Sequence, residues 1–168
     1  DGRVNKKIQR NYLEINSIID LNESNTVADG YYVQLVKPVD FQLNKFFYKN
    51  VGKNHHWVDR LIWTEKQWIE YVSDEKVKTY VLKNTDELAG YFELILHQNE
   101  IEIAYLGLLK DYQNKKLGSF LLSSAIKNSF LVKPNRVWVH TCSLDHKNAL
   151  SNYISRGMKI FKKETITI

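Results

Sequence analysis

The stretch that decides the fold runs from Leu106 to Ser119 and reads LGLLKDYQNKKLGS. An apolar strand stops in a polar turn, and the apolar spacing predicts an amphipathic helix from Lys115 to Phe130. The first N–H groups of such a helix lack partners and lie at the positive end of its dipole. We therefore expect an anion such as a phosphate to bind there. A plain strand-turn-helix with a solvated lysine pair would give the same pattern.

Strand and helix patterns alternate on both sides of this stretch. Before it, the sequence predicts strands and two helices, over 31–37, 41–52, 64–71, 77–82, 88–97 and 100–109. After it come a strand, a helix and a strand, over 136–142, 146–156 and 158–168. We expect Asp40 and Asp145 to cap helices, Thr64 to open a capping box and Gly157 to end the last helix. Short connections indicate antiparallel pairing of the three middle strands. The fold class is therefore α/β (α+β), a mixed sheet with helices on both faces.

Size and composition are those of one soluble globular domain. The chain has 168 residues, of which 43% are hydrophobic and 26% charged, and we expect residues 1–168 to form a single domain. Its core is expected at 31–163, with 1–30 as an N-terminal extension that is partly strand. No apolar run reaches the roughly 20 residues of a membrane span, and residues 1–7 do not resemble a secretory signal.

The charge and the cysteine content limit the expected classes of binding partner and the expected cellular location. The net charge is +5, and the basic residues are scattered rather than gathered on one arm, which does not favour nucleic-acid binding. The single cysteine, Cys142, excludes an internal disulfide framework and a cysteine-rich zinc site. We therefore expect a cytoplasmic protein with no membrane or nucleic-acid partner.

The opening stretch resembles motif A of the GNAT superfamily of N-acetyltransferases. The motif reads Gln/Arg-x-x-Gly-x-Gly/Ala after an apolar strand, and here Gln113 to Gly118 reads QNKKLG. Lys116 stands in the place of the first glycine, and Lys110 in the place of a common proline. A second match lies at Ala149-x-x-x-Tyr153-x-x-x-Gly157-Met158, which is similar to the family's Ala-x-x-x-Tyr-x-x-x-Gly-Phe.

Four further segments are similar to an uncharacterised bacterial branch of this family. They read HHWVDRLIWTEKQW (55–68), AGYFEL (89–94), EIAYLGLL (102–109) and VWVHTCSLDH (137–146). The resemblance covers about 31–163 in element order. It implies a GNAT-like sheet of six to seven strands, mostly antiparallel, splayed between the fourth and fifth core strands (100–109 and 136–142). Gly107 is the expected site of the bulge that splays them.

The resemblance also implies acetyl-coenzyme A (acetyl-CoA) as cosubstrate and no metal. The pyrophosphate would lie on backbone amides from Asn114 to Ser119, and the pantetheine arm on the edge of the strand at 106–109. We expect the Lys116 backbone to donate there while its side chain reaches a phosphate. The expected cofactor-binding residues are Leu106, Leu108, Leu109, Gln113, Asn114, Lys115, Lys116, Leu117, Gly118, Ser119, His146 and Tyr153.

Transfer to an amine needs a proton acceptor, an oxyanion donor and a proton for the leaving thiolate. Glu102 lies eleven positions before Gln113, where histone-modifying members of the family carry their general base. Glu93 on the neighbouring strand is the alternative base, because strand alternation does not tell which of the two faces the cleft. The backbone N–H of Leu108 is the expected oxyanion donor. Tyr153 is the expected general acid, although a packed tyrosine with a wet hydroxyl is also a common core feature.

The acceptor wall is expected at residues 55–63 of the loop 53–63, because the first two helices shape the acceptor pocket in the family. The expected substrate residues are Trp57, Asp59, Arg60 and His140. The tryptophans of this loop could equally be core residues. His55, His56 and Asp59 lack further ligands at local spacing for a metal site. Cys142 beside His140 or His146 could form an acyl-enzyme, but direct transfer in a ternary complex is the rule in this family.

The leading hypothesis is thus an acyltransferase, an acetyl-CoA-dependent N-acetyltransferase acting on a primary amine of a small molecule, peptide or protein. The alternatives are a coenzyme A-binding module with weak or no catalysis, which the altered glycine would suit, and an interaction protein that uses the fold as a scaffold. The sequence leaves the acceptor open. A homodimer also stays open, since family members often dimerise.

Overall fold

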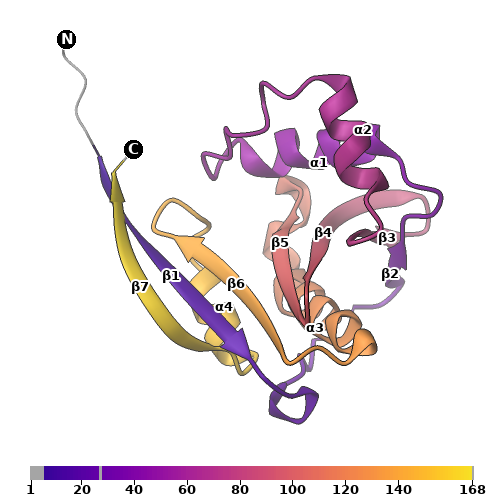
Figure 1. Ribbon diagram of the computed structural model, residues 1–168. Coiled ribbons are helices and arrows are strands. Elements are labelled where there is room, and N and C mark those ends of the chain that lie inside the picture. The colour runs from indigo at the N-terminus through magenta and orange to yellow at the C-terminus, as the bar shows by residue number, and fades with distance from the viewer. Residues whose placement is uncertain (1–5, 27, 168) are drawn as a thin grey trace.

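The computed structural model describes residues 6–26 and 28–167, apart from the side chains of Asn114 and Lys115. Its strands form one sheet in the order β2-β3-β4-β5-β6-β1-β7 (Figure 1). The strands are β1 (Lys7–Ile15), β2 (Tyr31–Leu35), β3 (Val77–Asn84), β4 (Glu87–His97), β5 (Glu100–Leu108), β6 (Arg136–Cys142) and β7 (Lys159–Thr167). Neighbouring strands run antiparallel except β5 and β6, which are parallel. The predicted mixed, mostly antiparallel sheet is confirmed.

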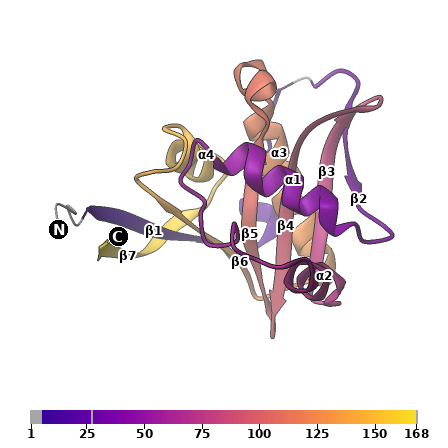
Figure 2. The ribbon, with the colours of Figure 1, turned by 90° about the horizontal axis from the view of Figure 1, so that it is seen from above.

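Helices cover both faces of the sheet. Figures 1 and 2 show α1 and α2 on one face of β3, β4 and β5, and α3 on the other. The helices are α1 (Phe41–Gly52), α2 (Glu65–Ser73), α3 (Leu117–Ser129) and α4 (Ala149–Ser155). Short 3-10 turns lie at Ile18–Asp20, Lys110–Lys115 and Phe130–Val132. The arrangement is GNAT-like, as the sequence predicted.

The predicted starts of the first two helices are confirmed. The Asp40 side chain accepts a hydrogen bond from the Gln42 N–H at 3.1 Å, which satisfies one of the helix's unpaired donors. Thr64 and Gln67 form the reciprocal capping box at the start of α2. These local hydrogen bonds depend on neighbouring residues alone, so the sequence was enough to locate them.

The start of the last helix was predicted wrongly. Asp145 does not cap it; its carboxylate accepts hydrogen bonds from the Thr141 hydroxyl and from the Cys142 N–H. Helix α4 instead begins at Ala149, with Asn148 at the N-cap position and no side-chain cap. Asp145 was free to do either, because a carboxylate after a strand can close the turn as readily as it can cap a helix. The end of α4 is as predicted, with Gly157 at φ 104°.

The hydrophobic core has two parts. The larger lies between the sheet and α3, and its fully buried members include Leu13, Phe92, Leu121 and Val137. The smaller lies under α1, where the ring of Phe47 stacks on Tyr91 at 4.7 Å. Burial on both faces of the central strands fixes how α1 and α3 lie relative to the sheet.

Strands β5 and β6 part soon after they begin. Their pairing covers only Glu100 to Glu102 on β5, whereas β5 continues to Leu108. The predicted splay between these strands is therefore present. The bulge lies elsewhere than expected: Glu93 pairs with Tyr105 and Leu94 with Ile103, which makes Ala104 the extra residue. Gly107 pairs in register with Tyr91 and lies against Val51 of α1, so its missing side chain serves close packing instead.

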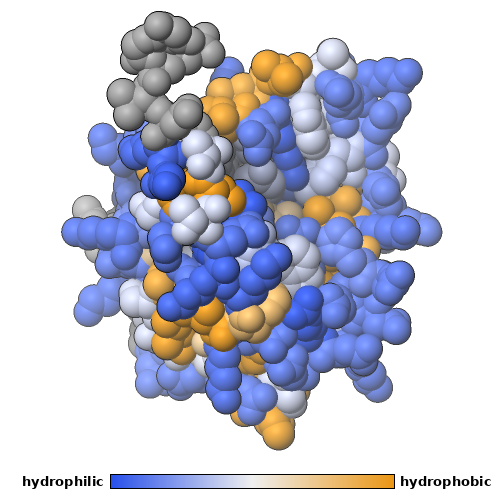
Figure 3. All heavy atoms as spheres, turned by 60° about the vertical axis from the view of Figure 1, so that its left-hand side comes forward, coloured by the Kyte–Doolittle hydropathy of each residue, from blue (hydrophilic) through white to orange (hydrophobic). Residues whose placement is uncertain are grey.

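The N-terminal extension supplies strand β1 between β6 and β7. Leu13 and Ile15 of β1 are buried in the larger core, so this segment is an integral part of the sheet. The face around β1 and β7 is predominantly hydrophilic, with apolar side chains in small groups (Figure 3). Over residues 6–26 and 28–167, no helix is long and apolar enough to cross a membrane.

The Gly157 conformation leads to a stability prediction. At φ 104° a side chain is strained, and an added Cβ would press on the backbone carbonyl oxygen of Asp20. We expect Gly157→Ala to lower the free energy of unfolding by about 2 kcal/mol or more. Urea denaturation measures this, with Gly118→Ala as control, since its Cβ would meet only Asn152 and Leu108 at 3.8 Å and beyond. Equal stability of the two variants would contradict the role of Gly157.

Candidate functional site

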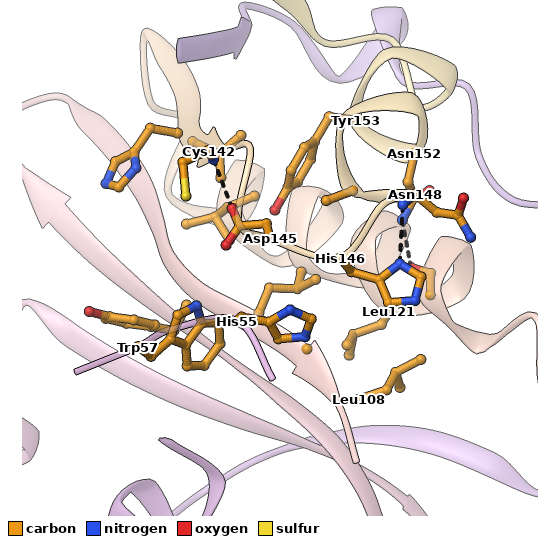
Figure 4. A pocket seen from close by; sticks show the side chains of 18 of the residues that line it. His55, Trp57, Leu108, Leu121, Cys142, Asp145, His146, Asn148, Asn152 and Tyr153 are labelled. Carbon is orange, nitrogen blue, oxygen red and sulfur yellow. Dashed lines mark hydrogen bonds between the residues drawn. The ribbon is translucent and has the colours of Figure 1, made fainter. Parts of the chain in front are cut away.

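The parting of β5 from β6 opens a cavity of about 1490 Å³. Its lining comes from the loop after α1, from β5 and β6, from the start of α3, and from α4 with the turn before it. Figure 4 shows His55 and Trp57 on one side, and Cys142, Asp145, His146 and Tyr153 on the other. Residues far apart in the sequence therefore meet in one place.

One end of the cavity is the turn before α3. Lys116 adopts a left-handed conformation, with φ 58° and ψ 24°, directly before the first helical residue. The Asn152 side chain donates to the Gly118 carbonyl oxygen at 3.1 Å, which ties α4 to this turn. The helix start thus faces the cavity with its partial positive charge. This geometry fits an anionic group such as a pyrophosphate.

The N-terminal extension also reaches this end, which the sequence did not indicate. The hydroxyl oxygens of Ser24 and Ser119 lie 2.7 Å apart, and that of Thr26 lies 3.1 Å from that of Ser119. All three residues line the cavity. Hydroxyls of this kind are suited to hydrogen bonding with phosphate or amide oxygens.

Most expected cofactor residues lie at this cavity. Those that line it are Leu106, Leu108, Gln113, Lys116, Gly118, Ser119, His146 and Tyr153. Leu117 is buried in the larger core and Leu109 packs against the smaller one. The Asn114 and Lys115 side chains lie outside the described part of the chain. The Gln113 amide reaches the Leu108 carbonyl oxygen at 3.5 Å, which links the strand end to the turn.

Tyr153 lies in the cavity wall opposite the loop 53–63, which follows α1. It extends from α4 toward the cavity (Figure 4), and only 8% of its surface is exposed. Burial, with a smaller effect of the nearby Asp145, raises the pKa of its hydroxyl above the ordinary 10. The hydroxyl therefore stays protonated at neutral pH and can donate a proton or a hydrogen bond.

The two candidate bases have different surroundings. Glu102 borders the cavity at the last paired position of β5 with β6, with an oxygen 2.8 Å from the Nε2 of His97. Glu93 is fully buried, and its oxygens accept hydrogen bonds from Arg60, Tyr71 and Asn44 at 2.6 to 3.0 Å. Of the two candidate bases, only Glu102 lines the cavity.

The expected acceptor residues are divided between two walls. Trp57 and Asp59 line the cavity from the loop after α1, with Trp57 half-buried against Tyr105 at 4.8 Å and Asp59 exposed. His140 is exposed near the end of β6, its ring 5.6 Å from that of Tyr12. Arg60 contributes to the lining, but its guanidinium is ion-paired with Glu93 at 3.0 Å.

His55 was not among the expected site residues, although it begins the expected acceptor wall, and its side chain lines the cavity. Its ring is 6.1 Å from that of His146, and its Nδ1 is buried with no hydrogen-bond partner among the described residues. Burial lowers its pKa below 6.5; Asp145 opposes this in part, and the neighbouring His146 lowers the pKa further, so the neutral ring predominates at pH 7. Only the tertiary structure brings His55 and His146 together. The described residues hold no group of three potential metal ligands.

Cys142 lines the cavity without the surroundings of a nucleophile. Burial and the nearby Asp145 raise the pKa of its thiol above 9.0, which leaves little thiolate at neutral pH. The geometry therefore gives no support to an acyl-enzyme at this cysteine.

A comparison with known protein families finds a match to the acetyltransferase (GNAT) family over residues 41–158. The chain belongs to this family. A search of curated proteins found no match. Family membership implies the use of acetyl-CoA. The turn before α3 is the segment whose sequence resembles the family's motif A.

Solved structures share the fold at low sequence identity. A GCN5-related N-acetyltransferase from Sphaerobacter thermophilus superimposes with a TM-score of 0.71 at 11% identity, covering 97% of this chain and 52% of its own. One from Kribbella flavida gives 0.67 at 13%, covering 95% and 56%. An aminoglycoside acetyltransferase from an uncultured soil metagenomic sample gives 0.65 at 13%, covering 77% and 88%. The chain thus spans little more than half the length of the first two proteins.

The left-handed Lys116 leads to a prediction about cofactor binding. In Lys116→Gly the backbone is relieved of strain, so stability should be unchanged or rise by up to about 1 kcal/mol. The lost cation should weaken acetyl-CoA binding by about fivefold, as expected for one exposed charge pair. Calorimetric titration measures the affinity, with Lys116→Arg as the charge-retaining control. Tighter binding by Lys116→Gly would show that the side chain does not reach a phosphate.

Proposed function

We propose that this protein is an acetyl-CoA-dependent N-acetyltransferase that transfers the acetyl group directly to a primary amine in a ternary complex. The observation that carries the proposal is the opened strand pair. Between Ile103 and Leu108, β5 has a free edge toward β6, and this edge leads from Glu102 to the turn before α3. A pantetheine arm can pair with such an edge as an added strand does, which would direct the acetyl group toward Glu102 and the acceptor loop.

Proton removal from the amine is assigned to Glu102. An alkylammonium with a pKa near 10 is not nucleophilic at pH 7, so a nearby carboxylate, acting directly or through water, is needed. Glu102 borders the cavity and is only partly exposed, whereas the oxygens of Glu93 already accept three hydrogen bonds. These surroundings favour Glu102 over Glu93 as the base.

The remaining steps are assigned to Leu108 and Tyr153. The amine nitrogen bonds to the thioester carbon, and the backbone N–H of Leu108 would stabilise the oxyanion. When the C–S bond breaks, the thiolate would take the Tyr153 hydroxyl proton, which Tyr153 then regains from solvent. The raised pKa of Tyr153 keeps that proton in place until it is needed.

The acceptor is proposed to be an amine on a small molecule or peptide, bound between the 53–63 loop and β6. Trp57 supplies a half-buried ring, and Asp59 supplies an exposed carboxylate that has no hydrogen-bond or ion-pair partner among the described residues. This pair suits an acceptor with an ammonium group beside an apolar body. One structural neighbour is described as an aminoglycoside acetyltransferase in complex with sisomicin. Amino sugars therefore belong in a first acceptor screen, beside polyamines, amino acids and peptide N-termini.

Three measurements test the proposal. Calorimetric titration should show acetyl-CoA binding, and free-thiol release should then reveal turnover with one or more primary amines. Acetyl-CoA binding without turnover across the whole panel would favour a coenzyme A-binding module, and no binding at all would favour a scaffold role. Mass spectrometry of the product should show one added acetyl group on the amine and none on Cys142.

Tyr153→Phe tests the general acid. Loss of the hydroxyl should lower kcat by about 10²-fold, because the thiolate leaves without its proton donor. The KM for acetyl-CoA should change far less, since the ring still packs in the wall. Steady-state kinetics at saturating amine measure both. An unchanged kcat would remove Tyr153 from the mechanism.

A further inference from the structure

The side chain of Arg60 is buried among aromatic rings. Its guanidinium carbon lies within 5.7 Å of the centres of five aromatic rings, those of Tyr48, Trp63, Trp68, Tyr71 and Tyr105. The nearest are Tyr71 at 4.1 Å and Tyr105 at 4.2 Å. The residue is 7% exposed, so these cation–π contacts are largely shielded from water and correspondingly strong.

The buried charge has one partner, Glu93. The Nη1 atom of Arg60 lies 3.0 Å from Oε1 of Glu93, whose carboxylate also accepts hydrogen bonds from Tyr71 and Asn44. Burial alone would lower the pKa of Arg60, but Glu93 together with Tyr71 and Tyr105 outweighs the burial, and the pKa is raised. Burial and Glu93 likewise raise the pKa of Tyr71, so its hydroxyl stays a donor. Arg60 therefore stays charged, and both carboxylate oxygens of Glu93 accept hydrogen bonds.

The two ends of this ion pair belong to different parts of the active site. Arg60 lies in the loop 53–63, which we call the acceptor wall. The backbone N–H of Arg60 also donates a hydrogen bond to the Tyr48 hydroxyl at 3.0 Å. Glu93 lies on β4 directly opposite the bulge, where it pairs with Tyr105, the residue after Ala104. The Arg60 guanidinium lies over the Tyr105 ring, and Trp57 of the acceptor wall contacts the same ring edge to face. One side chain thus connects the wall to the point where β5 bends away from β6.

We propose that Arg60 is a positioning residue that fixes the acceptor wall against the bulged strand and thereby sets the acceptor's place relative to the thioester. The inference rests on the proposed function for its kinetic consequence only. A buried ion pair contributes little to net stability compared with apolar packing, but its directional bonds can specify one geometry. Arg60 acts through Trp57 and Tyr105, whereas Trp57 and Asp59 face the acceptor.

Hydrogen exchange followed by mass spectrometry tests the positioning without any acceptor. In Arg60→Ala we expect amides of residues 53–63 and 103–106 to exchange about tenfold faster or more. Amides of α3 and its preceding turn should not change. Arg136→Ala is the matched control, because Arg136 also forms ion pairs, with Glu14 and Glu100, and stacks on Phe161 at 4.6 Å, but far from the wall. It should leave the exchange of the wall unchanged.

Chemical rescue separates positioning from a general loss of packing. Guanidinium chloride at about 20 mM, far below the molar range that unfolds proteins, can occupy the cage that Arg60→Ala vacates. It should restore slow exchange of the wall in that variant, and sodium chloride at equal concentration should not. Arg60→Lys keeps the charge but not the planar fork, so it should show an intermediate rate and serves if the alanine variant does not fold.

Kinetics provide the second readout. With an amine identified by thiol release, Arg60→Ala should lower kcat/KM for the amine by about 10²-fold and change the Kd for acetyl-CoA less than twofold. Guanidinium should recover part of the loss. If no amine is turned over, the proposed function fails while the exchange experiment still decides the positioning role.

Three results would overturn the inference. The first is unchanged exchange of residues 53–63 in Arg60→Ala. The second is faster exchange throughout the chain, α3 included, that guanidinium does not reverse, because this would mark Arg60 as an ordinary stability residue. The third is a loss of acetyl-CoA affinity as large as the loss of amine turnover.

Discussion

Pairing between β5 and β6 stops at Glu102, and the proposed active site is built around that interruption. Parallel strands normally continue their hydrogen-bond ladder, so a cause is needed for the parting. The extra residue Ala104 bends β5 locally, and Tyr105 beyond it is held by the rings and the ion pair under the acceptor wall. The gap then exposes a strand edge, which is unusual inside a sheet and is suited to binding an extended ligand.

Two unlike contacts keep the two sides of this gap in place. On the cofactor side, Asn152 of α4 bonds to the first turn of α3, and Ser24 and Thr26 meet Ser119. On the acceptor side, Arg60 and Glu93 join the loop to the sheet. The contacts on the cofactor side are neutral hydrogen bonds, whereas the contact on the acceptor side is a buried ion pair. Such a pair is costly to break, which is why we infer that it holds the acceptor wall in one position.

Local patterns in the sequence located most elements to within a few residues. The caps at Asp40 and Thr64, the three middle strands and the Gly157 helix end were predictable because each depends on residues close in the chain. The bulge and the role of Asp145 were not. Gly107 has the greater backbone freedom, yet the register between β4 and β5 places the extra residue at Ala104. Asp145 accepts its hydrogen bonds from the preceding strand β6 and does not cap the following helix.

The sequence by itself determined the order of strands and helices and the anion-binding turn that resembles the family motif, because hydrophobic period and turn chemistry are local. Only the tertiary structure shows that Glu102 lines the cavity whereas Glu93 is buried and ion-paired, since this depends on which face of each strand is buried and which charges lie across it. It also brought His55 to His146 and Arg60 to Glu93. Such pairings across long sequence distances arise from the packing of the acceptor wall onto the sheet, which no short stretch encodes.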